Sequence, residues 1–282
     1  RTTGMTLRRV PLFSWSMLIA ATVWVVSLPV LFADLVLAYV DYRHGQLSFG
    51  LPAALNQPFR WIFWQPAVYS FAIPVIGIMS EIVPVAARVR QRQHDVMLVA
   101  IGLFGFLSVG AWAHNADIQD NFLYPAFGFV AVVPLLMLLG GWGDSLRQGR
   151  PTGRGPVGAL LLATVAVLMV LAGVVAGVLR VIDPLDLLGT SATDGVMHLV
   201  LLGAIAGGAA GAVYWSSKLT GRAYPEAIAR TAALPLLAGI ALAGITDVIS
   251  GFLDQPEGLV TGRVKDSVEV LNVLSLIGLC LV

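Results

Sequence analysis

The side chains of this sequence that could carry out chemistry stand inside, or at the ends of, long apolar stretches. His114 and His198 carry imidazole groups, which bind transition metals through a neutral nitrogen. Asp34 and Asp247 each lie toward one end of an apolar stretch, where a carboxylate can take part in a proton path through a membrane. A plainer interpretation of both histidines stays open, with His114 a solvated ring at a helix end and His198 a ring packed at a helix interface.

The elements that must position these residues are helices that cross a membrane. The hydrocarbon core is roughly 30 Å thick and an α-helix rises about 1.5 Å per residue, so about 20 apolar residues span it. Continuous apolar runs such as residues 160–178 lack the alternation of a transmembrane β-strand. We therefore predict an all-α membrane protein, a polytopic transmembrane bundle of about eight helices. The predicted helices cover residues 12–40, 61–86, 95–114, 121–143, 156–182, 195–217, 227–252 and 267–282.

The composition excludes several classes of protein. Of the 282 residues, 57% are hydrophobic and only 12% are charged, whereas about 25% of the residues of a soluble domain are charged. A net charge of +1 gives no sign of nucleic-acid binding. The single cysteine, Cys280, excludes a disulfide scaffold and a zinc-type cysteine cluster, and we expect it to fill space in the core. The expected surroundings of the chain are therefore the lipid bilayer.

Basic residues are distributed unevenly between the two sides of the predicted bundle. The N-terminal tail and every second connection after it hold most of the Lys and Arg, while most acidic residues fall on the other side. Since basic residues concentrate on the cytoplasmic side of membrane proteins, we expect the N-terminal side in the cytoplasm and a multi-pass protein of the cell inner membrane. The basic residues on that side are Arg1, Arg8, Arg9, Arg88, Arg90, Arg92, Arg147, Arg150, Arg154, Lys218, Arg222 and Arg230.

The chain offers no boundary between soluble domains, so we predict that residues 1–282 form a single transmembrane domain. It begins with Arg1 and stops at Val282, inside its last apolar stretch. We therefore expect a piece of a longer bundle. The stretch rich in Gly, Pro and Arg at residues 147–156 is predicted to be a short cytoplasmic connector.

Several short stretches together resemble the C-terminal two-thirds of subunit I of the haem–copper cytochrome c oxidases. They are residues 4–15 (GMTLRRVPLFSW), 80–84 (SEIVP), 112–115 (WAHN), 218–222 (KLTGR) and 271–278 (LNVLSLIG). They occur in the family's order across nearly the whole chain and correspond to helices five to twelve of a twelve-helix subunit. The resemblance implies a helical membrane fold and, in the family, cytochrome c oxidase activity with haem and copper.

The resemblance also indicates where copper would be held, and the sequence departs from the family there. Where the family has H-P-E-V-Y, whose histidine binds copper and whose tyrosine cross-links to it, this chain has Gln65 and retains only Tyr69. Where the family has two adjacent histidines, this chain has His114 and Asn115. An amide does not replace an imidazole ligand effectively, so at most one of the three copper ligands remains. We therefore expect no copper centre and no catalytic residue apart from the residual Tyr69.

The haem and proton-path signatures of the family are changed as well. The family binds haem iron through H-F-H on its tenth helix, whereas this chain has His198, one place beyond the second ligand position when counted back from Lys218. The family's paired arginines, which neutralise the haem propionates, correspond to residues 255–258 (QPEG), where Glu257 would repel them. The family's proton-path lysine falls in residues 134–138 (PLLML), which have none. We therefore expect no cofactor, with His198 as the residual candidate for a haem ligand.

These departures predict a divergent subunit I-like protein that is not catalytic by itself. We expect a structural or assembly subunit of a respiratory electron-transfer complex, with other membrane subunits and the lipid bilayer as partners and no nucleic acid. Two alternatives stay open. In the first, the chain carries haem through His198 and takes part in electron transfer to oxygen within a cytochrome oxidase. In the second, it conducts protons or transports a solute, with Asp34 and Asp247 as relay groups.

Overall fold

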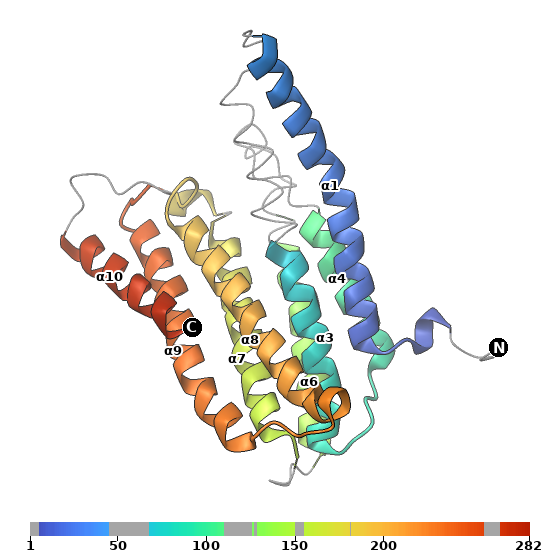
Figure 1. Ribbon diagram of the computed structural model, residues 1–282. Helices are drawn as coiled ribbons and strands as arrows, with labels where there is room; N and C mark the ends of the chain where they lie inside the picture. The colour runs from blue at the N-terminus through green and yellow to red at the C-terminus, as the bar shows by residue number, and fades with distance from the viewer. Residues whose placement is uncertain are drawn as a thin grey trace.

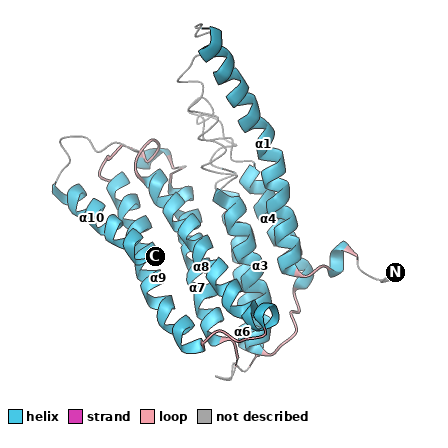
Figure 2. Ribbon diagram, in the orientation of Figure 1, coloured by secondary structure: helices cyan, strands magenta, loops and turns pink. Residues whose placement is uncertain are grey.

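The apolar stretches form α-helices, because every backbone N–H and C=O group in lipid must be hydrogen-bonded within the chain (Figures 1 and 2). The computed structural model describes residues 6–44, 68–109, 126, 129–149, 155–180, 182–256 and 266–282. The α-helices are α1 (Leu12–His44), α3 (Val68–Ala87), α4 (His94–Val109), α6 (Val132–Gln148), α7 (Val157–Leu179), α8 (Ala192–Thr220), α9 (Glu226–Gly251) and α10 (Asp266–Leu281). Two short 3-10 helices are also present: η1 (Leu7–Arg9) precedes α1, and η5 (Asp183–Leu185) lies between α7 and α8.

Each predicted helix corresponds to one of these α-helices, so the predicted all-α membrane bundle is confirmed within the described residues. Most boundaries differ by a few residues, but α6 begins at Val132, eleven residues after its predicted start at residue 121. Helix α8 begins three residues before its predicted start and runs on to Thr220. Within the described ranges, five helices are long and apolar enough to cross a membrane: α1, α3, α7, α8 and α9. Residues 61–67, 110–114, 121–125, 127–128 and 181 lie outside the described residues, and they belong to four of the predicted helices.

Consecutive helices run in alternating directions, and α8 lies in the middle of the bundle (Figure 1). It packs against α7 on one side, α9 on another and α3 on a third. On one flank α1 packs against α3 and α4, and on the other α10 packs against α9. Because α8 packs against α3, α7 and α9, its side chains can contribute to a site between these helices.

Glycines allow α8 to approach its neighbours closely. A Cβ atom placed on Gly203 would lie 3.2 Å from the carbonyl oxygen of Ala166 on α7, and one on Gly207 would lie 2.7 Å from the side chain of Val75 on α3. The small residues spaced four apart between residues 203 and 211 predict such close packing of membrane helices, and the structure confirms it.

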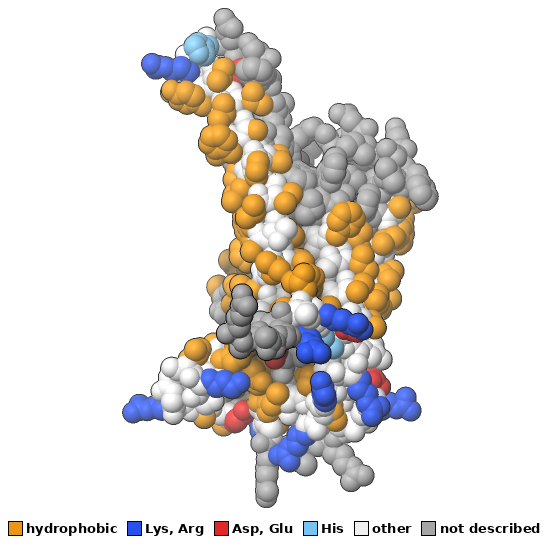
Figure 3. Space-filling view, turned by 90° about the vertical axis from the view of Figure 1, so that its right-hand side faces the viewer, with side chains coloured by type: hydrophobic (Ala, Val, Ile, Leu, Met, Phe, Trp, Pro, Cys, Tyr) orange, Lys and Arg blue, Asp and Glu red, His pale blue; other side chains and the backbone are white. Residues whose placement is uncertain are grey.

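Most basic side chains of the described residues gather at one end of the bundle, below a broad apolar surface (Figure 3), whereas Arg43 and Arg180 lie at the other end. We call this the basic end; α1, α4, α7 and α9 begin there. Its exposed basic residues are Arg8, Arg9, Arg88, Arg90, Arg92, Arg147, Lys218, Arg222 and Arg230. The charge asymmetry predicted from the sequence is therefore present in the folded chain.

The expectation that Cys280 fills space in the core is wrong. Its side chain is exposed on α10, which packs against α9 and leaves an apolar face uncovered. On that face Val270, Val273 and Leu276 are each more than half exposed. An apolar run does not reveal by itself whether a side chain faces a neighbouring helix or lipid, because both surroundings are apolar.

Candidate functional site

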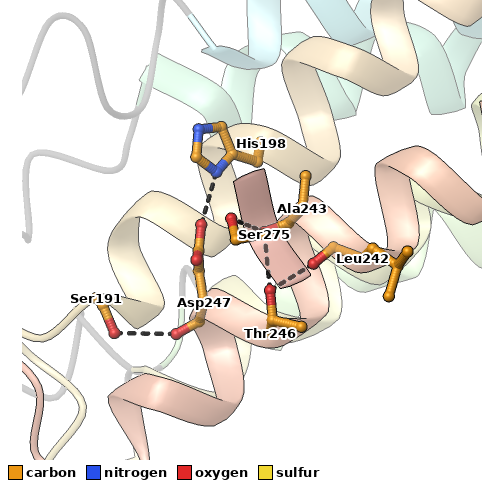
Figure 4. A network of polar contacts seen from close by, with 7 residues as sticks. All are labelled: Ser191, His198, Leu242, Ala243, Thr246, Asp247 and Ser275. Carbon is orange, nitrogen blue, oxygen red and sulfur yellow. Dashed lines mark hydrogen bonds and ion pairs between the residues drawn. The ribbon is translucent and has the colours of Figure 1, made fainter. Parts of the chain in front are cut away.

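His198 on α8 and Asp247 on α9 form a polar pair inside the apolar bundle (Figure 4). Nδ1 of the imidazole lies 2.7 Å from Oδ2 of the carboxylate, and the two side chains are 26% and 12% exposed. This contact is a hydrogen bond, and it is also an ion pair when the ring carries two protons. The residues predicted separately as a haem ligand and as a proton-path group therefore belong to one site.

The pair is positioned by the close crossing of α8 and α9 at two glycines. A Cβ atom on Gly195 would lie 2.7 Å from the carbonyl oxygen of Gly244 and 2.8 Å from the backbone nitrogen of Val248. A Cβ atom on Gly244 would in turn lie 3.1 Å from the carbonyl oxygen of Gly195. His198 and Asp247 each follow one of these glycines by one helical turn, so the crossing brings their side chains within hydrogen-bonding distance.

Hydroxyl groups tie the backbone of α9 to its neighbours around the pair (Figure 4). The Ser191 hydroxyl donates a hydrogen bond to the backbone carbonyl of Asp247 at 3.0 Å, and the Ser191 N–H donates to the carbonyl of Gln255 at 2.9 Å. The Ser275 hydroxyl on α10 donates to the carbonyl of Ala243 at 3.1 Å. Sequence reasoning did not identify Ser191, because serine in membrane helices usually bonds to its own helix and its partner here is 56 residues away.

The arrangement of the pair allows two kinds of chemistry. Because Asp247 occupies Nδ1, the other ring nitrogen of His198, Nε2, is left for a second partner. Nε2 can carry a proton whose positive charge the carboxylate neutralises, as a charge in apolar surroundings requires. Unprotonated Nε2 can instead bind a metal ion, since a carboxylate on Nδ1 is the usual device that orients a metal-binding imidazole.

Tyr69, the residual tyrosine of the copper-site motif, lies in another part of the bundle. Its side chain is 6% exposed, and its ring meets the ring of Phe104 on α4 edge to face at 5.5 Å between centroids. A Cβ atom on Gly177 of α7 would lie 3.1 Å from its hydroxyl oxygen. Tyr69 is thus packed among α3, α4 and α7, whereas the histidine–aspartate pair is held between α8 and α9.

The other predicted copper-site residues, Gln65, His114 and Asn115, lie outside the described residues, so the expected loss of that site stays a prediction. Within the described ranges, no three His, Cys, Asp or Glu side chains are grouped closely enough to hold a metal ion. His44 is the last residue of α1 and His94 the first of α4, at opposite ends of the bundle. Those two imidazoles therefore cannot share a metal ion.

The predicted relay residues Asp34 and Asp247 belong to helices on different flanks of the bundle. Asp34 lies within α1, which packs against α3 and α4, and nothing is described of its side chain. Asp247 lies on α9, which packs against α7, α8 and α10, on the other side of the bundle (Figure 1). The partner of Asp247 is His198 instead.

The haem that the resemblance implies can be tested against the packing of α8. Counting back from Lys218 places the family's two haem histidines at Gly195 and Met197. At Gly195 even a Cβ atom would press against the backbone of α9, so neither a histidine nor a haem fits there in this packing. At His198 a metal-binding ring does fit, through Nε2. Gly195 therefore does not suit the family's first haem-ligand position, whereas His198, one residue after the second position, is compatible with a haem ligand.

At the basic end, Arg8 from the N-terminal segment contacts the first turn of α4. Its Nε and Nη2 donate hydrogen bonds to Oδ2 of Asp95 at 3.0 and 2.5 Å. These hydrogen bonds hold the pKa of Asp95 below its ordinary value. Both side chains are more than half exposed, so solvent screens the pair and it serves to position the segment before α1 rather than to stabilise the bundle.

Comparison of the sequence with known proteins identifies the family of this chain. The model of the family described as "Cytochrome C and Quinol oxidase polypeptide I" matches residues 1–281. A protein of Nocardia farcinica named "Probable cytochrome c oxidase subunit 1-beta" is 30% identical over 99% of this chain and 48% of its own length. A "Putative cytochrome c oxidase subunit 1-beta" of Streptomyces avermitilis is 29% identical over 99% of this chain and 50% of its own.

A more distant relative, "Cytochrome c oxidase subunit 1" of Alkalihalophilus pseudofirmus, is 27% identical over 99% of this chain and 46% of its own length. The chain spans about half the length of these relatives. Its helices, its motifs and its match to the family model agree along nearly the whole sequence. The chain is therefore a multi-pass membrane protein that belongs to the subunit I family of the cytochrome c and quinol oxidases.

Proposed function

We propose that this chain is a structural or assembly subunit of a respiratory electron-transfer complex and that it does not itself catalyse oxygen reduction. It forms a single transmembrane domain over residues 1–282 in the cell inner membrane, with its basic end facing the cytoplasm. Its partners are the other membrane subunits of that complex. The proposed subunit has no copper centre and no haem at the family's haem positions.

One observation carries the proposal: α8 and α9 are in backbone contact at Gly195. A haem ligand at this position requires a side chain and a gap between the two helices. Direct packing of α9 on α8 fills that gap with protein, and a well-packed helix contact is what a structural subunit needs.

The sequence adds support at the copper positions. Gln65 and Asn115 stand where the family carries two of its three copper-binding imidazoles. One histidine supplies a single neutral nitrogen donor, and the two amides do not replace the other two donors that hold the copper ion in the family. The charges and helix contacts that hold a membrane bundle together do not depend on these groups, so the fold can persist without the metal.

The first experiment measures cofactors on the purified chain. A reduced-minus-oxidised absorption spectrum is recorded, and iron and copper are quantified on the same sample. We expect no haem bands and neither metal in stoichiometric amount. Haem bands with one iron per chain, or copper at one per chain, would refute the cofactor-free proposal.

The second experiment tests the structural role in the source cell. The chain is deleted, and the amount of each assembled respiratory complex is measured on native gels together with the turnover of the complex that remains. We expect less of one assembled complex, with unchanged turnover for each copy that still forms. A normal amount of every complex would contradict an assembly role, and a loss of turnover without a loss of complex would indicate catalysis.

A second function is favoured by the contact between His198 and Asp247. A carboxylate on Nδ1 with Nε2 available suits an axial haem ligand, so the alternative is a haem-carrying subunit in electron transfer to oxygen. A bound haem would supply the redox chemistry, while Asp247 would orient the ring. In this case His198→Ala abolishes the haem bands and His44→Ala, at the exposed end of α1, retains them. No described contact favours a proton relay from Asp34 to Asp247.

A further inference from the structure

The exposed basic residues at the basic end differ in whether they have a partner. Arg8 donates hydrogen bonds to Asp95, and Arg230 lies 3.8 Å from a carboxylate oxygen of Glu226. The ammonium group of Lys218 lies 5.6 Å from the centre of a tyrosine ring. For the other six, the described residues place no acidic side chain within ion-pair distance. These six are Arg9, Arg88, Arg90, Arg92, Arg147 and Arg222.

Four of the six lie where the connection between α3 and α4 crosses the end of α6, at the basic end (Figure 1). Gln91 in this connection accepts a hydrogen bond from the hydroxyl of Ser145 on α6 at 2.9 Å. Gly149, after the end of α6, lies so close to α3 that an added Cβ atom would be 2.6 Å from the Cβ atom of Ala87. Each of the four arginines is one or two residues from one of these contacts. They are Arg88, Arg90, Arg92 and Arg147, and we call them the arginine cluster.

The arginine cluster has little negative charge around it. The acids that follow it on α4 and precede Arg147 on α6 are Asp95 and Asp144, which accept hydrogen bonds from Arg8 and Gln148. Like charges that are held near one another repel, so the cluster favours an anion that neutralises several of them. A planar guanidinium group matches two oxygen atoms of a phosphate group with parallel hydrogen bonds. The chemistry of the cluster therefore fits a phosphate ester.

Helix α6 presents an apolar strip that ends at the arginine cluster. Val133, Leu136, Gly140, Gly143 and Arg147 follow one another at spacings of three and four residues, so they share one face of the helix, and all five are exposed. A Cβ atom on Gly140 or Gly143 would have no atom within 4 Å. Between Leu136 and Arg147, about 16 Å along the axis, this strip carries no side chain. A hydrocarbon chain can therefore lie against the backbone of α6 with a charged group at Arg147.

We propose that the arginine cluster binds the headgroup of an anionic phospholipid, with one acyl chain lying on the apolar strip of α6. The unpaired guanidinium groups supply the charge, and the strip supplies the contact for the acyl chain. A soluble phosphate ester or an acidic protein surface would use the charge and leave the strip unoccupied, so a lipid fits both features. The proposal goes beyond the structural role proposed above and depends neither on that role nor on which side of the membrane the basic end faces.

The test is native mass spectrometry of the purified chain in a neutral detergent. The chain is titrated with phosphatidylglycerol and, separately, with phosphatidylcholine that has the same acyl chains, and the dissociation constant of the first bound lipid is measured for each. One basic residue near a membrane surface strengthens the attraction to an anionic lipid by about fivefold. We therefore expect phosphatidylglycerol to bind the unaltered chain at least about tenfold more tightly than phosphatidylcholine.

Two double variants separate the cluster from the general charge of the basic end, because each removes two positive charges. Arg90→Gln with Arg92→Gln lies within the cluster, and Arg9→Gln with Arg222→Gln lies outside it. All four side chains are exposed, so helix content measured by circular dichroism should stay the same. We expect the first double variant to bind phosphatidylglycerol about tenfold or more weakly, with binding of phosphatidylcholine unchanged. The second double variant should leave both dissociation constants unchanged.

Three results would overturn the proposal. Equal binding of the two lipids by the unaltered chain would leave the arginines for an acidic surface of a partner protein, and it decides the question even if a variant does not fold. An equal loss in both double variants would mean that the overall charge of the basic end, and no particular site, attracts the lipid. Displacement of phosphatidylglycerol by an equal concentration of glycerol phosphate would mean that the site takes a soluble phosphate ester.

Discussion

The contact between α8 and α9 at Gly195 can be tested by adding a single methyl group. In Gly195→Ala the new Cβ atom would lie 2.7 Å from the carbonyl oxygen of Gly244 and 2.8 Å from the backbone nitrogen of Val248. Backbone atoms cannot rotate away as a side chain can. The two helices must therefore separate locally by several tenths of an ångström, and the variant is expected to be less stable.

The size of the loss follows from the packing. Overfilling a well-packed interior by one methyl group typically costs about 1–3 kcal/mol, while alanine is favoured over glycine inside a helix by about 1 kcal/mol. Gly208→Ala is the matched control, because it lies on the same helix, is exposed and has no atom within 4 Å of a new Cβ atom. Gly195→Ala should thus be less stable than Gly208→Ala by about 1–3 kcal/mol, a factor of about five or more in the unfolding equilibrium.

The assay is equilibrium unfolding in detergent micelles, with a denaturing detergent as titrant and tryptophan fluorescence as readout. Both variants gain the same helix propensity from alanine, so this contribution cancels in the difference between their free energies of unfolding. Equal stabilities for Gly195→Ala and Gly208→Ala would mean that α9 does not press on α8 at this point. The packing of α9 on α8 would then no longer exclude a haem-binding side chain at position 195.

Two further variants test polar contacts between helices, with the same unfolding assay. In the first, Glu226→Ala removes the carboxylate of α9 that accepts a hydrogen bond from the Gly158 N–H at 2.6 Å and caps the start of the parallel helix α7. The free energy of unfolding is expected to fall by about 1 kcal/mol. An unchanged unfolding midpoint would show that water caps α7 equally well. In the second, Ser80→Ala removes the hydroxyl that accepts a hydrogen bond from the buried indole N–H of Trp142 at 3.1 Å, and it should lower the free energy of unfolding by about 1–3 kcal/mol. The control Ser108→Ala loses a hydrogen bond to a carbonyl of its own helix and should cost less. A larger loss for Ser108→Ala than for Ser80→Ala would refute this explanation.

The helices could be predicted from the sequence because the thickness of the bilayer fixes the length of an apolar run. The close approach of α8 was predictable for a related reason, since glycines such as Gly203 and Gly207 leave no side chain between two backbones. The family was predictable because its short motifs follow one another in order, and the match over residues 1–281 confirms it.

The pairing of His198 with Asp247 could not be predicted from the sequence. The two residues are 49 positions apart, and each lies in a helix that is apolar on all sides. Such a helix has no polar face to show which side meets a neighbour, so its rotation follows from packing against several helices at once. The same reason explains why the exposure of Cys280 was missed.

The contact between His198 and Asp247 determines which atom of the imidazole ring is available for a ligand. In the described part of the bundle the Nδ1 position is taken by Asp247, so every chemical role of the ring passes through Nε2. A haem iron on Nε2 requires space beside α8 as well as an available nitrogen. Three residues before His198, the α8–α9 contact at Gly195 removes that space on one face. The packing therefore leaves no space for a haem-binding histidine at position 195, and a haem bound by α8 would depend on Nε2 of His198.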